Sequence, residues 1–146
     1  MTPLTEGWHA GVVTPTSSEL RIALVQEAAG LDPAGNRARL ESATPAGTDL
    51  VVLPEAFARD FGDAGSDVGP YAEPLDGPFG RELARVAELR GTTLVAGMFE
   101  TSADPERPWN TLLVRGAASA AYRKIHLYDS FGYRESDRLT AGGTEP

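Results

Sequence analysis

The sequence contains no cysteine among its 146 residues. Disulfides, thiolate metal sites and cysteine nucleophiles are therefore excluded within the chain itself. It also has only two histidines, His9 and His126, which are too few to build a zinc site of the usual kind. On these grounds the sequence predicts no metal ion and no other cofactor.

Long apolar runs and an excess of positive charge are also missing. No apolar stretch approaches the roughly 18 residues needed to span a bilayer, and Met1 to Glu19 lack the apolar core of a secretory signal. The formal net charge is −8, which argues against nucleic acid and anionic membranes as partners because both attract positive surfaces. The sequence thus predicts a cytoplasmic protein that binds neither.

The chain has the length of one domain, and its hydrophobic fraction of 41% is that of an ordinary globular protein. Residues 1–18 show no periodicity and are predicted to form a flexible leader, so the ordered domain is expected over residues 19–146. Apolar runs rich in branched residues predict buried strands, at Leu20–Gln26, Asp49–Leu53 and Thr92–Phe99.

Helical spacing appears between these strands, at residues 34–43 and Phe79–Arg90. Two shorter apolar segments, Thr111–Val114 and Ala120–Tyr122, are joined by Gly116 and small residues, which predicts a hairpin. Strands that alternate with helices and end in a hairpin indicate an α/β fold, in which a mixed sheet is layered with helices.

Glu55 follows the apolar run of residues 49–53 after a single proline. In open α/β sheets, ligand-binding groups gather just beyond the carboxyl ends of the strands. A carboxylate held there is suited to act as a general base. A helix cap or an ordinary loop carboxylate is the alternative interpretation of this residue.

Lys124 lies in the segment YRKIHL, after the last predicted strand. A fixed ammonium group is suited to stabilise a developing oxyanion, whereas a solvated lysine that protects an edge strand is the alternative. Glu135 follows eleven residues later in YDSFGYRESDR. It either orients the lysine by ion pairing or belongs to the ordinary surface.

Three further residues are candidates for substrate binding. Asn110, in PWNTLLV, either anchors the loop near Glu55 by hydrogen bonding or serves a simple turn. Tyr128 and Phe131 cluster with Tyr133 after the lysine. They form either the wall of a ligand pocket, since such pockets are mostly apolar, or local packing beneath a loop.

Five segments in this order resemble the nitrilase superfamily of carbon–nitrogen hydrolases: LRIALVQ, DLVVLPEAF, TTLVAGMFE, WNTLLV and YRKIHLYDSFGYRESDRLTAGG. The resemblance runs from about Leu20 to Gly143. It implies a four-layer αββα sandwich and a Glu–Lys–Cys triad, in which Glu55 is the general base and Lys124 the lysine. Glu135 matches the additional glutamate that follows the lysine in many members.

The resemblance implies hydrolysis of a small amide, nitrile or N-carbamoyl compound, with the acid released from a thioester at the cysteine. It also implies that the full-length parent is a homo-oligomer. In the family the cysteine follows the AGG segment after a further strand. This chain is therefore expected to be the N-terminal portion of such a domain and inactive by itself. The alternative is a non-catalytic partner or binding module that docks on a full-length homologue.

Overall fold

The computed structural model describes residues 19–144, so the predicted leader at residues 1–18 lies outside the described part of the chain. The described residues contain a five-stranded sheet and a separate two-stranded sheet. Two α-helices accompany them, α1 (Pro33–Arg39) and α2 (Pro78–Arg90), together with 3-10 turns η1 (Gly69–Tyr71) and η2 (Glu135–Asp137). The strands are β1 (Ile22–Leu24), β2 (Leu50–Val52), β3 (Thr93–Glu100), β4 (Trp109–Arg115), β5 (Ala120–Arg123), β6 (Asp129–Ser130) and β7 (Tyr133–Arg134).

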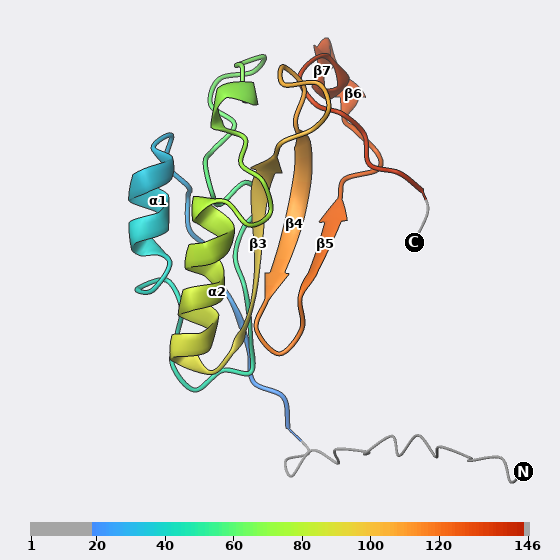
Figure 1. Cartoon of the computed structure of the whole chain (residues 1–146). Coiled ribbons are helices and arrows are strands. Elements are labelled where there is room, and N and C mark those ends of the chain that lie inside the picture. The colour runs from blue at the N-terminus through green and yellow to red at the C-terminus, as the bar shows by residue number, and fades with distance from the viewer. Residues whose placement is uncertain (1–18, 145–146) are drawn as a thin grey trace, which may run out of the picture.

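The direction of the strands decides which chain segments meet at the sheet's edge. The strand order is β1-β2-β3-β4-β5, with β1, β2 and β3 parallel. Strand β4 runs antiparallel to both β3 and β5, so β5 points in the same direction as β3 (Figure 1) and therefore as β2. The carboxyl ends of β2 and β5 therefore lie at the same edge of the sheet, although about 70 residues separate them in the sequence.

Helix α2 begins with Pro78 at its first position and ends at Gly91, whose φ of 61° gives a left-handed cap. Figure 1 shows α1 and α2 together on one face of the sheet. Leu83 and Val86 of α2 are fully buried there, in one apolar cluster with Leu94 of β3. This cluster is the main core, and it lies between the helices and the sheet.

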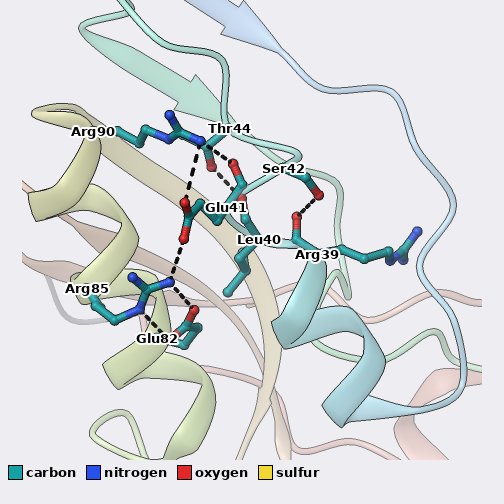
Figure 2. Close-up of polar contacts among 8 residues, drawn as sticks. All are labelled: Arg39, Leu40, Glu41, Ser42, Thr44, Glu82, Arg85 and Arg90. Carbon is teal, nitrogen blue, oxygen red and sulfur yellow. Dashed lines mark hydrogen bonds and ion pairs between the residues drawn. The ribbon is translucent and has the colours of Figure 1, made fainter.

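Helix α1 is shorter than the sequence predicted, because it ends at Arg39 and continues only as turns toward Thr44. Figure 2 shows how this end is tied to α2. Arg90 donates to the main-chain carbonyl of Glu41 at 3.2 Å, and Arg85 bridges the carboxylates of Glu41 and Glu82. The two helices are thus joined by polar contacts at the surface as well as by the core.

The other face of the sheet carries apolar side chains that no described residue covers. Leu112 of β4 and Tyr122 of β5 are paired in register and are 38% and 55% exposed. Ile22 and Leu24 of β1 are 52% and 78% exposed. The prediction of a buried first strand is therefore wrong, because β1 pairs on one side only and its outer face is uncovered.

Candidate functional site

Glu55 stands in a tight turn directly after β2, and this turn rests on β3. The amide of Ala58 donates to the carbonyl of Gly97 at 3.0 Å. A Cβ atom at Gly97 would lie only 2.3 Å from the backbone nitrogen of Ala56, so glycine alone permits this approach. Ala56 itself has a φ of 53°, a strained value for a residue with a side chain. The backbone of Glu55 is therefore held against the sheet, while its carboxylate extends outward.

Lys124 directly follows β5, and its backbone is held from two sides. Its amide donates to the carbonyl of Asn110 on β4 at 2.8 Å. Its own carbonyl accepts from the amide of Gly142, also at 2.8 Å. A Cβ at Gly142 would lie 2.5 Å from the carbonyl oxygen of Arg123. The AGG segment therefore runs close along this strand end because its second residue is glycine.

The side chains of Glu55, Lys124 and Glu135 are in direct contact. Lys124 Nζ lies 3.0 Å from Oε1 of Glu135 and 3.3 Å from Oε1 of Glu55. Asn110 Nδ2 donates to the same oxygen of Glu55 at 2.7 Å. The structure thus brings together four of the six residues that the sequence predicted for the site, counting Asn110, and these come from four different segments.

Burial differs across this group. The side chain of Glu135 is 4% exposed, that of Lys124 is 30% exposed and that of Glu55 is 58% exposed. Burial by itself would lower the pKa of Lys124, but the hydrogen bond to Glu135 and the charges of Glu55 and Glu135 outweigh it. The pKa of Lys124 is therefore raised, and its ammonium stays charged at neutral pH.

Glu135 is fixed by a reciprocal backbone arrangement with Tyr128. Its Oε2 accepts from the amide of Tyr128 at 2.7 Å, and its own amide donates to the carbonyl of Tyr128 at 3.0 Å. Next to it, Ser136 donates to Asp129 through both its hydroxyl and its amide, and these bonds lower the pKa of Asp129. The turn η2 is thereby joined to β6, which holds the Glu135 carboxylate in place beneath Lys124.

The predicted aromatic cluster is only partly present. The rings of Tyr128 and Tyr133 lie 6.4 Å apart between centroids. Phe131 is at the tip of the β6–β7 hairpin, where its φ is 54° and its side chain is 99% exposed. The structure therefore brings Tyr128 close to Glu135 through its backbone, whereas it leaves the ring of Phe131 in solvent.

A second polar cluster lies beside Lys124, and it was not predicted from the sequence. Glu100, at the end of β3, is 4% exposed, and its carboxylate accepts from Arg123 and from Thr111. The guanidinium of Arg123 also lies 3.7 Å from the ring centroid of Trp109. A charged residue at the end of an otherwise apolar strand was the available signal. The pairing of Glu100 with Arg123 cannot be predicted from the sequence, because 23 residues separate the two.

A simpler signal for the site lies in the composition. Lys124 is the only lysine of the chain, and the other twelve basic residues are all arginine.

Within residues 19–144, no group of three or more His, Cys, Asp or Glu side chains is arranged to hold a metal ion. Neither described helix is long and apolar enough to cross a membrane.

Two features of the Glu55–Lys124–Glu135 group decide which chemistry it can perform. The ammonium of Lys124 presents a permanent positive charge, which suits it to bind an oxygen that develops negative charge. Both donors to Glu55 contact Oε1, and within the described residues no hydrogen bond reaches Oε2. That oxygen is therefore available to accept a proton.

A family model for carbon–nitrogen hydrolases matches residues 21–146. The chain belongs to the carbon–nitrogen hydrolase family. This membership places it in the nitrilase superfamily, as the sequence segments indicated. A hydrolase from Mycobacterium tuberculosis is 44% identical over 137 residues, which are 87% of this chain and 47% of that protein.

Solved structures of the family have the same fold. A carbon–nitrogen hydrolase superfamily protein from Xanthomonas campestris, which carries an arsenic adduct in its active site, superimposes with a TM-score of 0.70 at 32% identity. The match covers 85% of this chain and 46% of that one. An amidase from Nesterenkonia sp. AN1, with acrylamide added at its active-site cysteine, gives 0.64 at 27% identity over 88% of this chain and 52% of the other.

The predicted nitrilase-like α/β fold is thus confirmed, and the chain spans about half the length of the relatives it matches. Among the described residues, the chain has one helical layer on one face of its five-stranded sheet. The uncovered face described above is apolar, as is usual for a sheet face that packs against a further layer.

Proposed function

We propose that this chain provides the general base and the oxyanion-binding lysine of a carbon–nitrogen hydrolase that acts on small amides or nitriles. The observation that carries the proposal is the contact of Lys124 Nζ with Glu55 Oε1 at 3.3 Å and Glu135 Oε1 at 3.0 Å. The 146 residues contain no cysteine, so the nucleophile of the family's triad has to come from other residues. The Nesterenkonia amidase, whose active-site cysteine adds acrylamide, supports this chemistry.

In the proposed reaction Glu55 takes the proton of the thiol through its free Oε2, and the thiolate attacks the amide carbon. The new carbon–sulfur bond forms as the carbonyl electrons move to oxygen, and the ammonium of Lys124 stabilises that negative charge. The carbon–nitrogen bond then breaks, and the proton held on Glu55 leaves with the departing ammonia. Water hydrolyses the remaining thioester with Glu55 as base, which releases the acid and restores the thiol.

The other residues support these two groups. Glu135 holds the ammonium from its buried side, and Asn110 holds one oxygen of Glu55 so that the other faces the substrate. Asn110, Tyr128 and Phe131 remain predictions as substrate-binding residues, and the exposed ring of Phe131 reaches a substrate only if the hairpin lies beside further residues of the site. A cytoplasmic location and an oligomeric full-length parent likewise remain predictions.

The proposal is tested in a chimera that joins residues 19–144 to the remaining half of the Mycobacterium tuberculosis relative, with ammonia release from small amides as the readout. We expect Glu55→Gln and Lys124→Met each to lower kcat by on the order of a thousandfold or more, since catalytic groups acting together cost that much when removed. Arg85→Ala, on the far side of α2, is the control and should retain activity. A folded, active chimera that tolerates Glu55→Gln would refute the proposed base.

A second candidate function is a non-catalytic chain that docks on a full-length homologue, and the uncovered sheet face favours it. Leu24, Leu112 and Tyr122 are exposed on this face, and such a surface needs a covering layer. The two candidates are distinguished by mixing this chain with the full-length relative. Formation of a stable complex without any amidase activity dependent on Glu55 of this chain would favour docking.

A further inference from the structure

Strand β5 is one of the two outer strands of the five-stranded sheet (Figure 1). Its first three residues, Ala120, Ala121 and Tyr122, are exposed, and Arg123 alone is partly buried. Apolar packing therefore does little to fix this strand. Besides the backbone ladder that joins β5 to β4, the side chain of Arg123 is the main side-chain attachment of this strand, and the next residue is Lys124.

The Arg123 side chain is held at a fixed point by Glu100. Glu100 ends β3, a central strand, and its side chain is 5% exposed. Its Oε2 accepts from Nε of Arg123 at 2.9 Å, its Oε1 accepts from Nη2, and Thr111 donates to Oε2 at 2.7 Å. This is the two-point geometry in which a guanidinium and a carboxylate bind most strongly. The bond to Glu100 raises the pKa of Arg123, so the guanidinium stays charged.

Trp109 fixes the plane of the same guanidinium. Its ring centroid lies 3.7 Å from Cζ of Arg123, a distance at which a cation over an aromatic face is attracted. The carboxylate and the ring together leave the guanidinium little freedom. Only arginine satisfies both partners, because a lysine ammonium has neither the fork nor the plane.

Consecutive residues of an extended strand point to opposite faces. Arg123 reaches Glu100 on the side of Met98 and the helices, because it pairs in register with Thr111, which pairs with Met98. Lys124 consequently points to the other side, where Glu55 lies. When the Arg123 side chain is held on the helix side of the sheet, the side chain of Lys124 is thus directed to the opposite side, toward Glu55.

We propose that Glu100, Arg123 and Trp109 form a clamp that positions Lys124, so that Arg123 and Glu100 are positioning residues for its ammonium. The inference rests on the proposed function, because the placement of Lys124 matters for catalysis only if its ammonium meets the substrate. The clamp acts on the backbone of β5 and does not itself contact the Glu55–Lys124–Glu135 group through any hydrogen bond that the described residues show.

The test uses the whole chain labelled with [13Cε]lysine, which yields one side-chain signal because Lys124 is the only lysine. A lysine held between two carboxylates shows two separate ε-methylene proton resonances, whereas a freely rotating one shows a single averaged resonance. The Glu100→Gln/Arg123→Gln double variant removes the clamp without leaving either charge unpaired and without adding a second lysine. We expect the two resonances to merge and the titration midpoint of Lys124 to shift downward.

Arg85→Gln is the matched control, since Arg85 also binds a carboxylate through two nitrogens but lies on the surface of α2 (Figure 2). Its lysine signal should equal that of the unaltered chain. Should the double variant not fold, Trp109→Leu weakens the clamp while keeping the ion pair, and its lysine resonances should move toward each other. The clamp is overturned if the folded double variant keeps the original separation of the two lysine resonances and the original titration midpoint. If the double variant does not fold, the same result in Trp109→Leu overturns it.

The same variants separate this inference from the proposed function. If Lys124 is released in the double variant while Lys124→Met leaves the chimera active, the clamp stands and the proposed role of the lysine fails. If Lys124→Met abolishes activity while the double variant leaves the lysine signal unchanged, the proposed function stands and the clamp fails.

Discussion

Gly97 lies directly beneath the turn that carries Glu55, with room for no side chain between strand β3 and that turn. The nearest backbone atom, the nitrogen of Ala56, is 2.3 Å from where a Cβ would stand. Because the atoms on the other side are backbone, a side chain at residue 97 has to displace the turn itself. The position of the Glu55 carboxylate therefore depends on a glycine 42 residues further along the chain.

We expect Gly97→Ala to lower the free energy of unfolding by about 1–3 kcal/mol, the usual cost of forcing extra atoms into a packed region. It should also lower the activity of the chimera, because the Glu55 turn moves away from Lys124. Urea denaturation and ammonia release measure the two effects. Gly143→Ala is the matched control, since a Cβ there meets nothing within 4 Å. Equal stability of the two variants would contradict the close approach.

Replacing Glu135 by Gln should lower the pKa of Lys124, because the negative charge that opposes the effect of burial on the ammonium is lost. A raised pKa means that the folded state binds this proton more tightly than the unfolded state does. The resulting stability is present below the usual lysine value of 10.5 and disappears as the pH rises through the folded-state pKa. As the pH rises through the folded-state pKa of Lys124, the unaltered chain should therefore lose more stability than the Glu135→Gln variant.

The measurement is the titration of the single lysine signal, combined with denaturant unfolding at neutral and alkaline pH. Glu88→Gln, an exposed carboxylate on α2, is the control and should leave the lysine midpoint unchanged. A midpoint in Glu135→Gln equal to that of the unaltered chain would show that Glu135 does not hold the ammonium in solution.

Asn110→Ala should weaken the chimera's activity without abolishing it. The amide donates to Glu55 Oε1 at 2.7 Å, and its loss leaves Lys124 as the carboxylate's remaining partner. We expect kcat to fall by roughly tenfold and the free energy of unfolding by about 1 kcal/mol. Thr44→Ala removes a buried hydrogen bond to Leu40 far from the site (Figure 2). It should cost similar stability and leave kcat intact. Equal kcat losses in both variants would argue for a purely structural role of Asn110.

The uncovered sheet face should make the isolated chain self-associate and bind a hydrophobic dye. Leu112→Glu places a charge on this face and should reduce both dye fluorescence and the apparent size on gel filtration. Leu89→Glu is the matched control, because Leu89 is 55% exposed on α2, away from the sheet. A monomeric unaltered chain with a cooperative melt would contradict the expectation.

Several features of the fold were predictable because they depend on local pattern. The apolar run before Glu55 becomes β2, Gly91 ends α2, and the segments around residue 116 form the β4–β5 hairpin. The first strand was placed correctly but assigned the wrong burial. Its apolar residues fit a covered strand, whereas the covering layer is not among the described residues.

Local patterns in the amino-acid sequence account for the elements and their chemistry: a carboxylate after β2, a single lysine after β5, and strands that alternate with helices. Periodicity and turn residues act over a few neighbours, so they are readable in a linear string. Tertiary structure decided the rest. The strand directions put the ends of β2 and β5 at one edge of the sheet, so that Lys124 meets Glu55 across 69 positions. The same long-range packing pairs Arg123 with Glu100 and seats Gly97 and Gly142 against backbone, because distance in space follows the sheet and not the sequence.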